Sequence, residues 1–295
     1  MTEVSNSAVR SVDIGGTKVA LAMVEGTRVT ERRQFPTPRT DRGSDLVAAI
    51  ASALGAMPGD GPVAIATTGL VDEGRLTALN PDTLPIENGF PLVDALRQVI
   101  GSPPLLVNDA QAAAWGEYRH GAGRGCASFA FMTVSTGIGA GIVVDGRLIV
   151  GRRGLAGHLG HVVAEPEGTR CGCGRRGCLE TVASGTALAR LATAAFGRAV
   201  AAPDLFALAA EGDTMAEGMI RSAARSIAIA LGNLAASCDV ERIALGGGVG
   251  LAPGFLERVV EAAAELPPTF HREIVRAEAG PDAGLIGVAA LLAER

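Results

Sequence analysis

Two kinds of apolar pattern alternate along the chain. Short apolar runs predict strands, and apolar residues at a spacing of three or four predict helices. The predicted strands cover residues 9–14, 19–24, 28–35, 63–67, 105–107, 128–134, 139–144, 242–245 and 274–276. The predicted helices cover 44–57 (capped by Ser44), 110–118, 215–238 and 283–293, with others beginning at Pro91 and Pro253. Because strands and helices alternate, the predicted fold class is α/β.

Length and two similar segments indicate two lobes. A chain of 295 residues is long enough for about two domains. Residues 9–24 and 128–144 each read as a strand, a glycine turn and a second strand, which suggests two related lobes. We expect one lobe over 1–119, with the closing helix 283–295 packed on it. The other covers 120–282 and contains a loop rich in glycine and cysteine at 157–180.

Composition excludes several classes of protein. Lys and Arg number 26 and Asp and Glu number 31, so the net charge of −5 argues against a nucleic-acid partner, which usually needs a basic surface. A hydrophobic fraction of 48% excludes a disordered chain. The 40 glycines do not recur at every third residue, which excludes a collagen-like fibre.

No segment predicts export or membrane insertion. Residues 1–8 are polar, and the apolar run at 9–14 is too short for a signal peptide. Residues 125–144 are uncharged and long enough to span a bilayer, but they contain serine, threonine and glycine and end in the turn dipeptide Asp145-Gly146. We expect two buried strands there. Five cysteines, three of them clustered, fit a cytoplasmic protein with one metal site better than a disulfide framework.

Three glycine turns, each at a strand end, are candidate nucleotide contacts. In Asp13-Ile-Gly-Gly-Thr-Lys18, successive N–H groups can point at phosphate oxygens, and Asp13 can hold Mg²⁺ directly or through water. The spacing matches neither a Walker A loop nor a dinucleotide-binding fingerprint, and taken alone the segment could be an ordinary hairpin turn. One turn could hold phosphates and another adenosine. The candidate residues are Gly15, Gly16, Thr17, Lys18, Thr136, Gly137, Gly139, Gly246, Gly247 and Gly248.

Three cysteines within eight residues, Cys171, Cys173 and Cys178, predict a metal site. Thiolates at this density usually bind zinc, which takes four tetrahedral ligands. The fourth ligand is expected to be His158 or His161, and the spacing does not decide between them. A closed set of three cysteines and one histidine is typical of a structural site, because a catalytic zinc keeps one position open.

The pair Asn108-Asp109 follows a predicted strand, where open α/β sheets place ligand sites. A carboxylate there can accept a hydroxyl proton during phosphoryl transfer, and the asparagine can hydrogen-bond the same substrate. The alternative is that Asp109 caps the helix that follows it.

The motifs together resemble a known family. Asp13-Ile-Gly-Gly-Thr-Lys18, Asn108-Asp-Ala, Thr136-Gly-Ile-Gly139, Gly160-His161 and Cys171-Gly-Cys-Gly-x-x-Gly-Cys178-Leu-Glu180 look like the ROK family of sugar kinases, in the same order and across nearly the whole chain. The resemblance implies an actin-like (ribonuclease-H-like) ATPase fold with two lobes around a cleft. It also implies ATP, Mg²⁺ and a structural Zn²⁺, with a hexose 6-hydroxyl as acceptor. It makes Asp109 the general base and His161 the fourth zinc ligand. The expected sugar-binding residues are Gly69, Asn80, Asn108, Asp109, His158, His161 and Glu180.

One departure from the pattern bears on the sugar. Glucokinases of this family usually have Gly-Glu-x-Gly-His, whereas this chain has Gly157-His158-Leu-Gly-His161. Histidine offers a donor, an acceptor and an apolar face, which suits an N-acetyl group. The substitution, with Thr77-Ala-Leu-Asn80-Pro81 and residues 108–118, resembles the bacterial N-acetylmannosamine kinases of the family. It implies that the chain phosphorylates N-acetyl-D-mannosamine at the 6-hydroxyl, a step of sialic acid catabolism.

Other functions are alternatives to an N-acetylmannosamine kinase. A glucokinase of the same family is the alternative enzyme. A sugar-sensing repressor is disfavoured because only 12 residues precede Asp13, too few for a DNA-binding domain. An actin-like filament protein is disfavoured because it would need neither the metal loop nor Asp109. A homodimer is expected only because it is the commonest oligomer.

Overall fold

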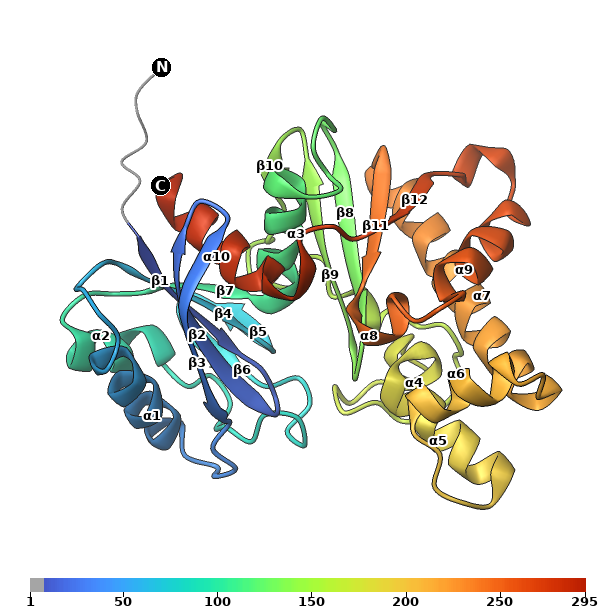
Figure 1. The fold of residues 1–295 in the computed structure, drawn as a ribbon, viewed down its shortest axis with the longest axis horizontal. Coiled ribbons are helices and arrows are strands. Elements are labelled where there is room, and N and C mark those ends of the chain that lie inside the picture. The colour runs from blue at the N-terminus through green and yellow to red at the C-terminus, as the bar shows by residue number, and fades with distance from the viewer. Residues whose placement is uncertain (1–7) are drawn as a thin grey trace. The chain divides into compact units, whose positions relative to one another are not determined.

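The computed structural model describes residues 8–295 as two compact units (Figure 1). Unit 1 comprises residues 8–121, Leu148–Ala156 and Ala279–Arg295, and unit 2 comprises Ala122–Arg147 and Gly157–Glu278. The predicted lobes, 1–119 with 283–295 and 120–282, stay a prediction. Among residues 8–295, no helix combines the length and apolar character needed to cross a membrane.

The sheet of unit 1 has the strand order β3-β2-β1-β4-β7. β1 (Val9–Ile14) pairs antiparallel with β2 (Lys18–Glu25), and β2 pairs antiparallel with β3 (Arg28–Pro36). β4 (Val63–Thr67) runs parallel to β1, and β7 (Leu105–Asn108) runs parallel to β4. The register places Ile14 beside Thr67 and Thr67 beside Asn108, so the carboxyl ends of these three strands meet at one edge.

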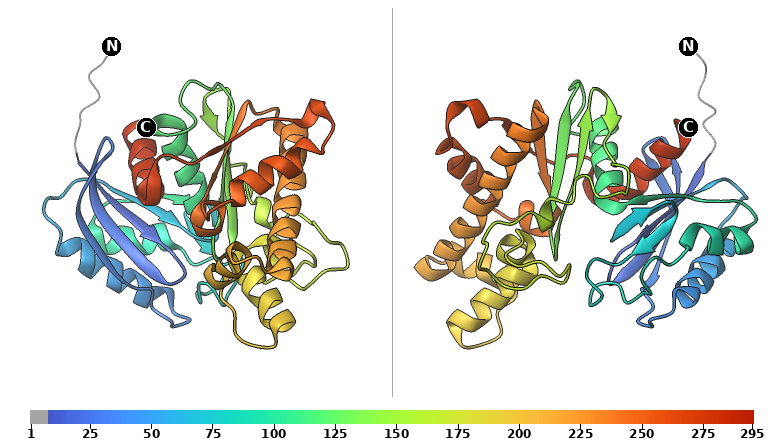
Figure 2. Two further views of the ribbon diagram at one scale, coloured as in Figure 1. Left: turned by 45° about the vertical axis from the view of Figure 1, so that its right-hand side comes forward. Right: turned by 180° about the vertical axis from the view of Figure 1, so that it is seen from behind.

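Alternation along the strands divides the core of unit 1 into two layers. Val63 and Ile65 of β4 pack with the apolar residues of α1 (Gly43–Gly55) and α2 (Leu92–Ile100). Ala64 and Ala66 point to the other face, which α10 (Ala283–Ala293) covers (Figure 2). The small alanine side chains allow α10 to lie close to the sheet, while the larger valine and isoleucine fill the layer below α1 and α2.

α3 (Asp109–His120) packs tightly against α10 within unit 1. Gly287 of α10 lies against the backbone of Ala112, so that any side chain at position 287 would collide with α3. The two helices therefore meet backbone to backbone, and this contact fixes the start of α3, where Asp109 lies.

Unit 2 repeats the sheet arrangement of unit 1. Its strand order is β10-β9-β8-β11-β12, again a pair of antiparallel hairpin strands beside parallel ones. The strands are β8 (Phe129–Val134), β9 (Ile138–Val144), β11 (Arg242–Gly246), β12 (Glu273–Arg276) and the two-residue β10 (Arg147–Leu148), of which Arg147 is the last residue of this segment of unit 2. The helices are α4 (Glu180–Ala183), α5 (Gly185–Phe196), α6 (Ala202–Ala210), α7 (Thr214–Cys238), α8 (Gly247–Gly250) and α9 (Phe255–Ala264).

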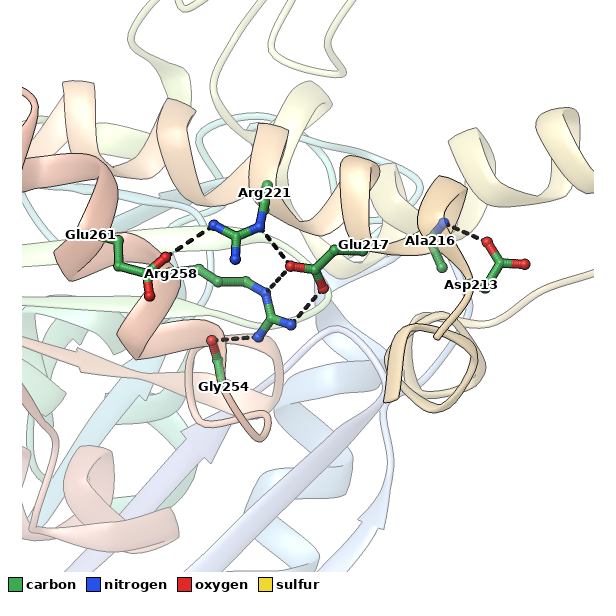
Figure 3. Close-up of polar contacts among 7 residues, drawn as sticks. All are labelled: Asp213, Ala216, Glu217, Arg221, Gly254, Arg258 and Glu261. Carbon is green, nitrogen blue, oxygen red and sulfur yellow. Dashed lines mark hydrogen bonds and ion pairs between the residues drawn. The ribbon is translucent and has the colours of Figure 1, made fainter. Parts of the chain in front are cut away.

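Helix α7 lies in the core of unit 2 along most of its length, and its alanines pack beside Ile220, Ile227 and Leu231. A charged cluster joins it to α9 (Figure 3). Arg258 binds Glu217 through two hydrogen bonds of 3.0 and 2.5 Å. Arg221 binds the same carboxylate at 2.7 Å and Glu261 at 2.9 Å. Because hydrogen bonds from Arg258 favour its charged form, the pKa of Glu217 is lowered.

The structure confirms every predicted strand to within a few residues, and it corrects three details. Ser44 is not the cap of α1, because Arg42 precedes the helix and the backbone N–H of Gly43 donates to Glu87 Oε2 at 2.6 Å. A hairpin of β5 (Leu70–Asp72) and β6 (Arg75–Thr77) was not predicted. The helix expected from Pro253 begins at Phe255, after the short helix α8.

Candidate active site and metal centre

The turn between β1 and β2 is held from one side. The N–H of Gly15 donates to the carbonyl of Lys18 at 3.0 Å and closes the turn. Thr37, just after β3, donates its hydroxyl to the carbonyl of Gly15 at 2.7 Å and its N–H to the carbonyl of Thr17 at 3.0 Å. None of the peptide bonds in residues 8–295 is cis, so each N–H points away from the preceding carbonyl. The N–H groups of Gly16 and Lys18 therefore point away from Thr37, and N–H groups in such a position can bind an anion.

Gly16 leaves no room for a side chain. A Cβ atom there would lie 2.5 Å from Thr83 Cγ2 and 2.8 Å from the Thr83 carbonyl oxygen. The turn therefore packs directly against residue 83, which any larger residue at position 16 would push away.

Asp13, near the end of β1, is the strongly perturbed acid of this edge. Burial of its carboxyl, together with the nearby charge of Asp109, raises the pKa of Asp13 to about 7, although the ammonium group of Lys18 acts in the opposite direction. Its Oδ2 atom also lies close to the start of α10, 3.6 Å from where a Cβ of Gly284 would be. Two carboxyls and an ammonium group thus share one small region, an arrangement suited to binding a divalent cation.

Asn108 caps α3, and this settles one alternative raised by the sequence. Its Oδ1 accepts hydrogen bonds from the N–H groups of Ala110 and Gln111 at 3.0 and 3.2 Å. Its Nδ2 donates to the carbonyl of Gly69 at 3.0 Å. The N-cap is therefore not Asp109, which is the first residue of the helix. A carboxylate in the first turn is favoured by the helix dipole.

The structure ties two expected sugar-binding residues into backbone contacts. Gly69 adopts a φ of +96°, and its carbonyl is the one that Asn108 binds. Asn80 is half-buried, and its Oδ1 accepts the N–H of Asp82 at 3.1 Å.

In unit 2, the glycine turns at 136–139 and 246–248 lie beside the same strand end. The N–H of Ser135 donates to the carbonyl of Gly137 at 2.9 Å, which closes the first turn. Gly247, with a φ of +85°, lies against Thr133 and Val134 at the end of β8. The two turns therefore lie next to each other on this unit, at the end of β8.

Glu180, the first residue of α4, reaches the first of these turns. Its Oε2 accepts the N–H of Ile138 at 3.0 Å, and a Cβ at Gly137 would lie 2.5 Å from the same oxygen. Burial raises the pKa of Glu180, and the hydrogen bond from Ile138 partly offsets this.

The four residues of the predicted metal site come together in unit 2. One ligand atom from each of His161, Cys171, Cys173 and Cys178 lies within 4.8 Å of the other three. The Sγ atoms of Cys173 and Cys178 are 3.6 Å apart, and Cys171 Sγ is 3.6 Å from His161 Nδ1. Sulfurs bound tetrahedrally at ~2.3 Å from zinc would be about 3.8 Å apart. The donor set and its spacing therefore fit a tetrahedral zinc.

The protonation tendencies agree with a metal centre. Burial, with neighbouring thiols, raises the pKa of Cys178 to about 12, and a bound metal cation would deprotonate this thiol by coordinating it. Burial lowers the pKa of His161, as do His158 and Arg175, which keeps the imidazole in its neutral, metal-binding form. The structure places His161 in the cluster and His158 beside it, with the ring centres 6.4 Å apart.

Comparisons with known proteins decide the family. The ROK family matches residues 9–295. This chain belongs to the ROK family. It is 44% identical to an N-acetylmannosamine kinase of Yersinia pestis (strain Pestoides F) over 95% of this chain and 96% of that protein.

Solved ROK structures confirm the predicted fold class. A ROK hexokinase from Thermus thermophilus matches with a TM-score of 0.84 and 38% identity, over 96% of this chain and 97% of that one. A ROK glucokinase from Streptomyces griseus, solved with glucose and AMPPNP, matches with a TM-score of 0.82 and 33% identity, over 97% and 99%. This ROK chain therefore has the actin-like ATPase fold, and it is a sugar kinase.

Sequence reasoning did not select Thr37. A threonine after a strand matches no motif, and its role depends on the pairing of β2 with β3, which sets Lys18 opposite Pro36. The register of the β2–β3 hairpin is the feature from which the position of Thr37 could have been predicted.

Proposed function

We propose that this ROK kinase transfers the γ-phosphoryl group of ATP to the 6-hydroxyl of N-acetyl-D-mannosamine, giving N-acetylmannosamine 6-phosphate and ADP. The observation that carries the proposal is the 44% identity to an N-acetylmannosamine kinase along 95% of the chain. The histidine at position 158, beside the metal cluster, is the feature that supports an N-acetylated sugar over glucose.

In unit 1, we propose Asp109 as the general base. Its carboxylate takes the proton of the 6-hydroxyl as that oxygen attacks the γ-phosphorus, and the bond to ADP breaks with its electron pair on ADP. Asp13 would hold Mg²⁺, which when bound neutralises phosphate charge. The amides of Gly15 to Lys18, with the Thr17 hydroxyl and the Lys18 ammonium group, would bind phosphate oxygens. Gly69, Asn80 and Asn108 would orient the sugar.

In unit 2, the glycine turns and the metal loop have separate roles in the proposal. The backbone of Thr136, Gly137 and Gly139 would bind phosphates, and Gly246 to Gly248 would lie by adenosine. Glu180 would accept hydrogen bonds from sugar hydroxyls, and His158, with His161 next to it, would contact the N-acetyl end. A zinc held by His161, Cys171, Cys173 and Cys178 would order the loop that leads into Glu180.

A glucokinase is the second candidate. The observation that favours it is the 33% identity to a ROK glucokinase solved with glucose. A coupled assay of ADP release with N-acetylmannosamine, glucose, N-acetylglucosamine and fructose separates the two. We expect kcat/KM to be highest for N-acetylmannosamine, and a higher value for glucose would favour the second candidate.

The His158→Glu variant tests the proposed selector. We expect it to shift the ratio of kcat/KM values towards glucose, because a carboxylate accepts from sugar hydroxyls and has no apolar face for an acetyl methyl. An unchanged ratio would remove His158 as a selector.

We also propose a homodimer in the cytoplasm. The dimer rests on the frequency of twofold oligomers and is tested by light scattering after gel filtration. The cytoplasm is supported by the five cysteines, none of which forms a disulfide.

A further inference from the structure

Arg39 lies in an exposed segment after β3, and its guanidinium group makes three hydrogen bonds within unit 1. Nη1 donates to the carbonyl of Gly16 and to the carbonyl of Thr83, both at 3.1 Å. Nη2 donates to the carbonyl of Asp82 at 2.9 Å. One side chain thus bridges two segments more than 60 residues apart in sequence, residue 16 and residues 82–83.

The first of these segments is the turn proposed to bind phosphate. Thr37 already holds the carbonyls of Gly15 and Thr17, and Arg39 holds the carbonyl of Gly16 between them. All three carbonyls of the turn are therefore bound from one side. Because the peptide units are trans, the N–H groups of Gly16, Thr17 and Lys18 each point away from the carbonyl of their own peptide unit, which Thr37 or Arg39 holds.

The second segment is the turn that begins at Asn80, a proposed sugar-binding residue. The carbonyl of Asn80 accepts the N–H groups of Thr83 and Leu84 at 3.0 and 3.2 Å, and its Oδ1 accepts the N–H of Asp82. A shift of residues 82–83 would therefore carry Asn80 with it. Thr83 also packs directly against Gly16.

We propose that Arg39 is a positioning residue that couples the sugar-binding loop at Asn80 to the phosphate-binding turn at Gly16. This inference rests on the proposed function for the roles of those two segments. When bound sugar fixes residues 80–83, the Arg39 guanidinium group that is hydrogen-bonded to residues 82–83 also fixes the Gly16 carbonyl. The neighbouring N–H groups proposed to bind phosphate are thereby held in place. Each substrate then binds more tightly when the other is present.

An arginine is suited to this role. Its planar fork offers several N–H donors at fixed angles, so it can hold carbonyls from two segments at once. A lysine ammonium is a point charge on a flexible chain and holds such carbonyls less rigidly. The charge also strengthens the bonds to neutral carbonyls.

The test compares Arg39→Ala and Arg39→Lys with the control Arg42→Ala. Arg42 is an exposed arginine three residues away, and its side chain makes no hydrogen bond or ion pair within residues 8–295. For each protein, the KM for ATP is measured at low and at saturating sugar, together with kcat and the melting temperature. The sugar is whichever member of the panel the wild-type protein phosphorylates best.

We expect saturating sugar to lower the KM for ATP of the wild-type protein and of Arg42→Ala by about fivefold or more. In Arg39→Ala this effect falls to less than about twofold and kcat/KM falls roughly tenfold, with Arg39→Lys in between and melting temperatures unchanged. An Arg39→Ala protein that keeps the wild-type dependence of the ATP KM on sugar overturns the inference. So does a wild-type protein that shows no such dependence. A wild-type protein that phosphorylates no sugar overturns the proposed function instead.

Discussion

The carboxylate of Glu180 accepts a hydrogen bond from the backbone N–H of Ile138, with 3.0 Å between Oε2 and the amide nitrogen. The bond joins the residue proposed to bind sugar hydroxyls to the turn proposed to bind phosphates in unit 2. It is the counterpart, on this unit, of the contacts that Arg39 makes in unit 1. In each unit, one side chain connects a segment proposed to bind sugar with a turn proposed to bind phosphate.

The first prediction concerns Gly137→Ala. A Cβ at this position would lie 2.5 Å from Glu180 Oε2, so the carboxylate must move and its bond to Ile138 is lost. We expect the KM values for both the sugar and ATP to rise, each by about tenfold. Gly218→Ala is the matched control in the same unit, because no atom lies within 4 Å of a Cβ placed there. Steady-state kinetics that leave the sugar KM unchanged in Gly137→Ala would contradict the role of Glu180.

The second prediction concerns Asp109→Asn. Asparagine keeps the shape of the side chain but cannot accept the hydroxyl proton, so kcat should fall by about 10²- to 10⁴-fold. Folding should be unaffected, because Asn108, and not Asp109, caps α3. Asp94→Asn, an exposed acid in the first turn of α2, serves as control. A turnover of Asp109→Asn close to that of the control would remove Asp109 as the base.

The third prediction uses the pKa of Asp13, which burial raises to about 7 from 3.8. The unfolded chain ionises this carboxyl first as the pH rises, so its contribution to the free energy of unfolding is largest below pH 4. It decreases between pH 4 and 7 and is constant above pH 7. The Asp13→Asn variant has no carboxyl at this position, so its free energy of unfolding does not decrease in this way between pH 4 and 7. Calorimetry without nucleotide or Mg²⁺ should therefore show that the variant is more stable than wild type at pH 8 by at least about 2 °C, and that the difference shrinks towards pH 4.

The same variant should lose activity while it gains stability. Without the Asp13 carboxylate, Mg²⁺ and the phosphates are held less well, so kcat/KM should fall by about 100-fold or more. A variant that is less stable than wild type at pH 8, or that keeps wild-type activity, would contradict the assignment of Asp13.

The fourth prediction concerns the metal centre. Cys173→Ser removes one of the four ligands and should reduce bound zinc from about one to well below one per chain, as measured by atomic emission. Because the loop leads into Glu180, the KM for sugar should rise more than the KM for ATP, and the melting temperature should fall by about 5 °C or more. Cys126→Ser, a cysteine outside the cluster, is the control. Full zinc content in Cys173→Ser would contradict the ligand set.

Local patterns predicted most of the fold. The strands were visible as short apolar runs, and β4 shows why: all five of its residues are buried, so almost every position is apolar. The turns at Gly15 and Gly137 and the cluster at Cys171 were visible because their chemistry is contiguous in sequence. The site contacts that were missed join distant segments. Thr37 acts through a hairpin register and Arg39 through a loop 44 residues away, and neither leaves a local pattern.

Helix starts were the least predictable elements. Ser44 has the residue type of a cap, but α1 begins one residue earlier because Glu87, from another loop, satisfies the N–H of Gly43. Asp109 also has the residue type of a cap, and the position is taken by Asn108, whose side chain binds both the helix and Gly69. In both cases a contact with a residue distant in sequence determines which residue precedes the helix.

The most direct test of the account is the identity of the product. The protein is incubated with N-acetylmannosamine and Mg²⁺-ATP, and the mixture is followed by phosphorus and proton magnetic resonance. We predict one ADP for each phosphomonoester formed, with the new phosphorus coupled to the two protons on carbon 6. No phosphomonoester, or a phosphorus coupled to the proton of carbon 1, would contradict a 6-kinase of N-acetylmannosamine.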